Sequence, residues 1–301
     1  MNLKDSIKKT IAYFDLFDYP LTAEEIKEYL YQYSSLLHIK EVKGVLGQMT
    51  EEGVIEELKE HFILKGRGSI LETRKSHKFI AEKLWNRTKL YGQYMRAVPF
   101  VKMIAVCNNL SYDNPSQESD IDLFIVIKPE RMWLARLIIS LILQFYGVRR
   151  HGNKVAGRFC LSFFVTTNKL DMEELEIKPE DPYLAYWTSM LSPIYGEETY
   201  EEFKKANEKW LREKYGLKFA DSVLKHMYVA EESGVKKFFE WMFGGWFGNL
   251  LEGILKKTFK KKTLAKMKKT GPEADIIVTD DMLKFHNHDR RAEYYGKWKN
   301  A

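Results

Sequence analysis

The chain has 301 residues, of which 45% are hydrophobic and 30% are charged, and its formal net charge is +6. This length is enough for two or three small cores, and the composition is ordinary for a soluble protein. Cys107 and Cys160 lie in apolar runs without CxxC spacing, which indicates a reducing compartment and argues against a disulfide framework or a thiolate metal site.

Neither a secretory signal nor a membrane span is visible. The N-terminal stretch MNLKDSIKKT has no apolar core of the kind found in signal peptides. The longest apolar run, residues 134–147, contains Arg136 and Gln144 and is shorter than the roughly 20 residues that a spanning helix needs. We therefore expect this run to form a buried helix and the protein to be cytoplasmic.

Charge is unevenly distributed along the chain. Residues 65–102 contain ten Lys or Arg against two acids, and residues 253–271 contain eight lysines and no acid. Acidic residues gather in the segment 170–215, which has twelve Asp or Glu against six Lys or Arg. The two basic zones suggest contact with a polyanion, and solvated helix faces are the alternative for either zone taken alone.

Residues 1–68 have the pattern of a winged helix-turn-helix domain. Apolar side chains recur at helical spacing over residues 3–16, and Thr22 with Glu25 forms a capping-box signature for a second helix. A third helix is predicted over residues 39–52, and VIEELKEHFILKG then reads as two short strands around a polar turn. Three helices followed by a hairpin is the order of a winged helix.

The third of these helices is a poor match for a DNA-recognition helix. It offers Lys40 and Lys43, but also Glu41, Glu51 and Glu52, which phosphates would repel. DNA binding and docking of a partner protein both remain open, and docking is at least as well supported.

A basic connecting helix is expected over residues 69–98, ending at Pro99. Two strands follow, FVKMIAV and DIDLFIVI, separated by a turn-rich loop. Because side chains alternate along a strand, Asp120 and Asp122 should project from one side and Ile121 from the other. Two adjacent carboxylates repel each other unless a cation lies between them, and Mg²⁺ is the natural partner for such a pair.

The segment 100–167 resembles the nucleotidyltransferase superfamily, which has the DNA-polymerase-β-like fold. The family motif is a strand, a Gly-Ser turn that opens a helix, and a second strand with Asp-x-Asp/Glu, here SDIDLFIV. The resemblance implies that Asp120 and Asp122 bind Mg²⁺ and are catalytic. It also implies a nucleoside triphosphate, with ATP expected, whose nucleoside monophosphate is transferred to a hydroxyl of an acceptor.

Two positions depart from the family pattern. The Gly-Ser turn is replaced by Asn108 and Asn109. Asparagine tolerates a left-handed backbone better than most residues, and its side-chain amide can donate to phosphate. The strand expected over residues 159–166 has Ser162 where the family usually has a third carboxylate. Three other acids are remote candidates for that role: Asp113, Glu118 and Asp171.

The basic loop VRRHGNKVAGR lies where the resemblance places the triphosphate, and a solvated loop is the alternative reading. The residues predicted to bind the nucleotide are Asn108, Asn109, Ser119, Arg149, Arg150 and Lys154.

Residues 171–301 are expected to be helical with a short tail. One long helix is predicted from Val235 into the lysine cluster, and its early aromatics favour a bundle core or partner groove over an interfacial membrane helix. In the tail, His286, His288 and Asp289 form a weak metal-site pattern. The neighbouring Arg290 and Arg291 are expected to form ion pairs or to touch a phosphate.

We therefore expect an α+β protein with a winged helix (1–68), a connecting helix (69–98), a nucleotidyltransferase-like core (99–170) and a helical C-terminal domain (171–301). Its expected partners are a nucleotide and an acceptor, which would be a small molecule, a protein or a nucleic acid. The competing hypothesis is a protein that kept this fold for binding or regulation and lost the chemistry.

Overall fold

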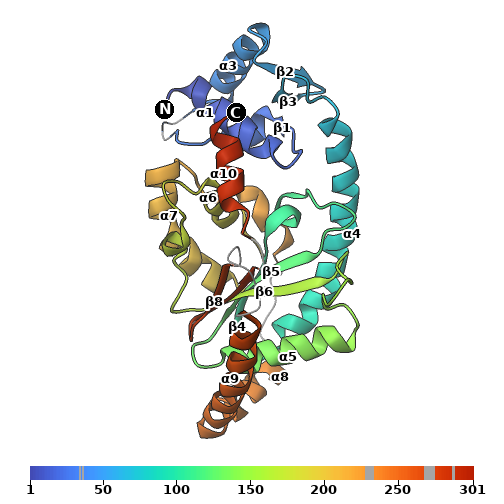
Figure 1. Cartoon of the computed structure of the whole chain (residues 1–301), viewed down its shortest axis with the longest axis vertical. Helices are drawn as coiled ribbons and strands as arrows, with labels where there is room; N and C mark the ends of the chain where they lie inside the picture. Colours follow the sequence, from blue (N-terminus) through green and yellow to red (C-terminus); the bar gives the residue numbers. More distant parts are fainter. Residues whose placement is uncertain (34, 36, 228–233, 268–274, 287–288) are drawn as a thin grey trace.

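The computed structural model describes residues 1–33, 35, 37–227, 234–267, 275–286 and 289–301 (Figure 1). The chain has a mixed α/β structure with a small sheet near its N-terminus and a larger sheet in the middle. Both termini lie at the same end, where Trp298 donates a hydrogen bond from Nε1 to the carbonyl oxygen of Lys9 over 2.9 Å (Figure 1).

The N-terminal elements enclose the small antiparallel sheet, whose strand order is β1-β3-β2. The elements are α1 (Leu3–Asp15), β1 (Leu21–Thr22), α2 (Ala23–Glu28), α3 (Ile39–Glu51), β2 (Ile55–Leu58) and β3 (His61–Leu64). The capping box predicted at the start of α2 is confirmed: the hydroxyl of Thr22 accepts from the backbone N–H of Glu25, and the Glu25 carboxylate accepts from that of Thr22. The hairpin β2–β3 is also confirmed.

The connecting helix α4 (Ile70–Arg96) leads into the larger sheet, whose strand order is β7-β4-β5-β6-β9-β8. Its strands are β4 (Val101–Val106), β5 (Ile121–Ile127), β6 (Phe159–Thr166), β7 (Ser192–Tyr195), β8 (Asp275–Val278) and β9 (Met282–His286). β5 and β6 are parallel, and the remaining neighbours are antiparallel.

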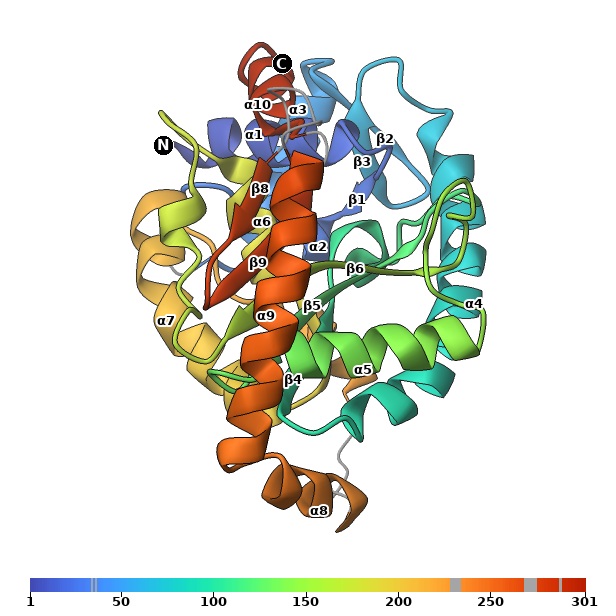
Figure 2. The same cartoon turned by 60° about the horizontal axis from the view of Figure 1, so that its bottom comes forward.

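Helices cover both faces of the larger sheet (Figure 2). The remaining helices are α5 (Met132–Phe145), α6 (Pro182–Ser189), α7 (Glu197–Tyr215), α8 (Gly234–Met242), α9 (Trp246–Met267) and α10 (Arg291–Lys299), with short 3₁₀ helices η1 (Asn108–Tyr112), η2 (Glu173–Leu175) and η3 (Asp221–His226). In β5, Ile121, Leu123 and Ile125 pack with α4, α5 and α9. Phe124 and Val126 pack on the other face, with α6, α7 and the N-terminal elements.

The expectation of a C-terminal domain built of helices with a short tail is wrong for β7, and the tail supplies two strands, β8 and β9. β7, β8 and β9 come from this region and complete the larger sheet, so a boundary at residue 170 runs through that sheet. These segments are short, and they become strands because the edges of β4 and β6 supply hydrogen-bonding partners from distant parts of the sequence.

The single long helix expected after Val235 is instead two helices, α8 and α9. The chain turns between them so tightly that a Cβ on Gly248 would lie 1.8 Å from the carbonyl oxygen of Phe243. Only glycine fits this close approach. None of the helices within the described ranges has both the length and the apolar composition needed to cross a bilayer.

Candidate functional site

Asp120 and Asp122 lie at the start of β5, on the side of the sheet that faces α6. Asp122 follows the alternation that also points Phe124 toward this face, whereas Ile121 is buried on the opposite face. The backbone N–H of Cys107 donates to the carbonyl oxygen of Asp122 over 3.1 Å, which ties the end of β4 to the start of β5. The predicted placement of both carboxylates on one side is therefore confirmed.

Asn108 holds the side chain of Asp122 from the turn after β4. Its Nδ2 donates to Oδ2 of Asp122 over 2.7 Å, and its own Oδ1 accepts from the hydroxyl of Tyr183 at 3.3 Å. Asn108 has a φ of 58°, in the left-handed region that asparagine tolerates better than most residues. The turn thus has the backbone conformation for which glycine is the usual residue, and it opens only the 3₁₀ helix η1.

Asp120 forms an ion pair with Arg150, whose Nη1 lies 2.6 Å from Oδ2 of the carboxylate. The same guanidinium nitrogen lies 3.6 Å from the sulfur of Cys160. Cys160 is paired with Asp122 in the parallel register of β5 and β6. Ligand atoms of Asp120, Asp122 and Cys160 all lie within 4.8 Å of one another, so this group could hold a metal ion.

Burial and the neighbouring charge of Asp120 raise the pKa of Asp122 to about 6, although the hydrogen bond from Asn108 acts in the opposite direction. Burial also raises the pKa of the Cys160 thiol. Cys160 is therefore a protonated thiol at neutral pH, and the available charged ligands are carboxylate oxygens. Oxygen ligands suit a hard cation such as Mg²⁺ better than a soft one.

These residues line a cleft of about 830 Å³. Its positively charged side chains outnumber its carboxylates, which are Asp120, Asp122 and Asp289. The cations are Arg136, Arg149, Arg150, Lys284, Arg290 and Arg291. Most of these six have an acidic partner: Arg290 pairs with Glu293, and Arg291 pairs with Asp181, Asp275 and Asp289.

Arg136 and Arg149 differ from the other cations of the cleft, because neither has an ion-pair partner among the described residues. Arg136 projects from α5 over the ring of Phe285, with 4.9 Å from its guanidinium carbon to the ring centre. Its buried Nε has no hydrogen-bond partner. Burial, followed by the charge of Arg149, lowers the pKa of Arg136 to about 10. A half-buried cation without an acidic partner is less favourable than a paired one, and an anionic ligand would neutralise it.

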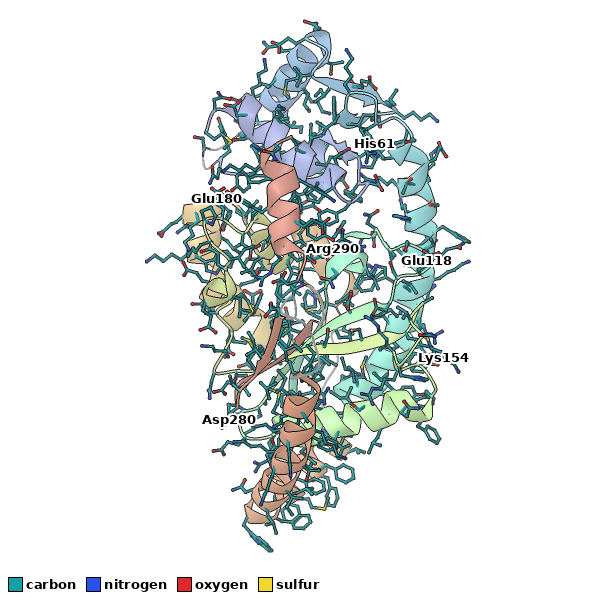
Figure 3. All side chains as sticks on the ribbon, viewed as in Figure 1. His61, Glu118, Lys154, Glu180, Asp280 and Arg290 are labelled. Atoms are coloured by element: carbon teal, nitrogen blue, oxygen red, sulfur yellow. The ribbon has the colours of Figure 1, made fainter. Side chains whose placement is uncertain are left out.

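The structure brings together only some of the residues predicted to bind the nucleotide. Asn108, Arg149 and Arg150 line the cleft with the two aspartates. The others do not: Asn109 is exposed and accepts from the hydroxyl of Tyr112, and Ser119 accepts from the N–H of Ser116 within its own turn. In the view of Figure 3, Lys154 and Glu118 lie at the edge of the molecule, and the exposed Arg290 lies in the middle of the view.

β6 has no carboxylate at the position where the family usually has its third one. Ser162 lines the cleft at the expected position on β6, and it is not an acid. Of the remote candidates, Asp113 pairs with Lys225, and Asp171 accepts from the backbone of Glu173. Neither of them, nor Glu118, lines the cleft.

Several cleft residues were not found from the sequence. Cys160 reaches the site through strand register, which leaves no local signal. Arg136 does have a local signal in the sequence, because it is a charged residue within the apolar run 134–147. Tyr183 and Trp187 are four residues apart on α6, and this spacing puts both on one face of the helix, toward the cleft. The proposed metal site in the tail cannot be placed, because His288 lies outside the described residues.

Comparisons with protein-family models, with curated proteins and with solved structures find no match to this chain. Its function therefore has to be inferred from the residues of the cleft.

Proposed function

We propose that the cleft binds a nucleoside triphosphate together with Mg²⁺ and transfers the nucleoside monophosphate to a hydroxyl of an acceptor. The observation that carries the proposal is the pair Asp120 and Asp122, held side by side in a cleft whose other charged groups are mostly cations. The raised pKa of Asp122 shows that a second negative charge is unfavourable there, and a divalent cation would remove that penalty.

The arrangement of strands supports the nucleotidyltransferase-like fold. β4 and β5 are antiparallel neighbours joined by the turn at Asn108, and β5 is parallel to β6 after the crossover through α5. The turn, the two aspartates and Ser162 all face the same cleft, as the resemblance requires.

The residues present fit a magnesium ion. Mg²⁺ commonly takes one or two protein carboxylates and completes its shell with water and substrate phosphates. Asp120 and Asp122 would hold it, and when bound it would neutralise charge on the reacting phosphate. Arg136 and Arg149, as unpaired cations, are assigned to the remaining phosphate charge. Tyr183 and Trp187 offer aromatic surface to a base.

A second candidate is a protein that binds the nucleotide but does not transfer it. Two observations favour it. Ser162 occupies the position of the third carboxylate, so the acceptor hydroxyl has no evident general base. Arg150 lies 2.6 Å from Asp120, so its guanidinium and a divalent cation would compete for the same carboxylate.

Both candidate functions require that the cleft binds a nucleotide together with Mg²⁺. Calorimetric titration with a non-hydrolysable ATP analogue, with and without Mg²⁺, tests this binding. Asp120→Asn and Asp122→Asn keep the side-chain shape and remove the charge, so Mg²⁺-dependent binding should be lost. Glu118→Gln is the matched control, because this exposed acid lies outside the cleft and should bind as the unmodified chain does. Equal binding by the three variants would contradict the proposed metal site.

Release of pyrophosphate from ATP then separates the two candidates. Binding that depends on both aspartates, accompanied by pyrophosphate release, supports transfer. The same binding without release, across acceptors of the small-molecule, protein and nucleic-acid classes, supports the second candidate.

We further propose that the N-terminal elements form a winged helix, and that it docks a partner protein. The order α1-β1-α2-α3-β2-β3 supports the fold. The positive charge of α3 is partly neutralised, because Lys43 pairs with Glu24 at 3.0 Å. The competing DNA-binding hypothesis predicts retention on duplex DNA that falls steeply with salt. Such retention by the full chain would overturn the docking proposal.

A further inference from the structure

The helix α8 has its polar and apolar sides reversed relative to an ordinary surface helix. The side chain of Lys236 is buried, and its Nζ donates to the carbonyl oxygen of Val101 over 2.6 Å and contacts the hydroxyl of Tyr195 at 2.7 Å. Glu240 also faces inward, where its carboxylate accepts from the backbone N–H of Phe100 over 2.7 Å. Lys236 and Glu240 thus hold α8 against the sheet, and its aromatic side chains are left outside.

The start of α9 is fixed to the body in a similar way. Glu252 is buried and accepts from the backbone N–H groups of Trp133 and Leu134, at 2.9 and 2.8 Å. Arg131 donates to the carbonyl oxygens of Phe243 and Gly244 and to the side chain of Asn249. Because these contacts fix both helices, the outward direction of their apolar side chains is set by the fold.

The outer surface of α8 and the first half of α9 is strongly apolar. Trp241 is 78% exposed and Trp246 is 76% exposed. We call the whole exposed set the aromatic tip: Val235, Phe238, Phe239, Trp241, Trp246, Phe247, Leu250 and Ile254. This exposure contradicts a bundle core for the early aromatics, and it leaves the alternative expectation of a partner groove untested. In both views, α8 and the adjoining part of α9 form the end of the molecule opposite to the N-terminal helices (Figures 1 and 2).

Exposed lysines adjoin the aromatic tip. Lys237 lies within α8, and Lys257, Lys261 and Lys262 follow Ile254 on α9. These four lysines have no acidic partner in the part of the chain that the structure describes. Tryptophan and phenylalanine next to lysines are typical of segments that lie at the interface of an anionic membrane.

We propose that the aromatic tip binds the surface of a membrane that contains anionic lipid. The aromatic rings enter the headgroup region, and the lysines contact lipid phosphates. The charge of these lysines favours an anionic surface over a second copy of the same tip, since two copies would bring the same lysines together. The inference is independent of the function proposed for the cleft.

Sedimentation of the full chain with lipid vesicles tests the proposal. We expect binding to vesicles of phosphatidylcholine mixed with phosphatidylglycerol, and weaker binding to phosphatidylcholine alone. The double variant Trp241→Ser/Trp246→Ser should lower the partition coefficient by about tenfold or more. Phe145→Ser is the matched control, because Phe145 is 84% exposed at the end of α5, outside the tip, and its loss should leave binding unchanged.

A charge variant separates the two contributions. Lys257→Glu/Lys261→Glu should weaken binding to the anionic vesicles and leave the small partition into phosphatidylcholine unchanged. Failure of the unmodified chain to sediment with either vesicle at low salt would overturn the proposal. It would also be overturned by a dimer in solution that the double tryptophan variant converts to a monomer, because the tip would then be an interface between two copies.

Discussion

Asn108 and Asp122 are 14 residues apart in the sequence and are joined by a hydrogen bond of 2.7 Å. The bond links the turn after β4 to the pair of carboxylates on β5, so the backbone conformation of the turn and the ionisation of the site depend on the same side chain. This arrangement leads to the first two predictions.

Replacing Asn108 should separate its backbone role from its side-chain role. Asn108→Gly keeps the left-handed turn and removes the amide donor, so the pKa of Asp122 should rise above its value of about 6. Asn108→Ala also loses the donor and adds backbone strain, so it should be less stable than Asn108→Gly by about 1 kcal/mol. Carboxyl ¹³C NMR titration measures the pKa, and urea unfolding measures the stability. Equal stability of the two variants would contradict the backbone role.

Asp122 should make stability fall as the pH rises. Its pKa in the folded chain, about 6, lies above its ordinary value of 3.8, so its protonated form is favoured by the fold. The contribution of Asp122 to the free energy of unfolding is therefore fully present below about pH 4 and is lost as the pH passes about 6. Asp122→Asn should remove this part of the pH dependence. Urea unfolding of the unmodified chain and of Asp122→Asn between about pH 4 and pH 7 measures this contribution as the difference between their free energies of unfolding at each pH.

The same ionisation predicts how Mg²⁺ binding depends on pH. Below about pH 6, a proton on Asp122 competes with the metal, so the affinity should fall by about tenfold for each pH unit. Calorimetric titration of Mg²⁺ on either side of this pH measures the slope. A flat profile would mean that Asp122 is not a metal ligand.

Two arginines of the cleft should respond oppositely to substitution. Arg136 is half-buried without an acidic partner among the described residues, so Arg136→Met should leave stability unchanged or raise it while it weakens binding of the ATP analogue by about tenfold or more. Arg291→Met should destabilise the chain, because it removes the cation that pairs with the buried Asp181. Melting temperature and calorimetric titration of both variants provide the comparison. A loss of stability in Arg136→Met as large as that in Arg291→Met would indicate a structural role for Arg136.

The carboxylate of Glu252 should stabilise the start of α5. It accepts from two buried N–H groups that no residue of α5 itself satisfies. Glu252→Ala should therefore lower the free energy of unfolding by about 2–4 kcal/mol. Within the described part of the chain, the one ion pair of Glu201 is with Lys204 on the surface, so Glu201→Ala should change the free energy of unfolding by less than about 0.5 kcal/mol. Urea unfolding measures both, and similar values for the two variants would contradict the role of Glu252.

Local patterns were sufficient for many elements of the fold. The capping box at Thr22, the hairpin β2–β3, the long helix α4 and the two strands β4 and β5 follow from signals within short segments. One part of the site also follows from a local pattern, because the alternation of side chains along β5 is enough to put Asp120 and Asp122 on one side.

The sequence by itself determined most of the helices and strands up to β6, because capping and side-chain periodicity act over a few neighbouring residues. Only the tertiary structure decided that β7, β8 and β9 join the larger sheet, that Cys160 lies beside Asp122, and that α8 exposes its aromatics. Each of these depends on a partner far along the chain, such as the carbonyl group of Val101 that receives Lys236. Periodicity within a segment records that one face is apolar, and the contacts made elsewhere decide whether that face is buried.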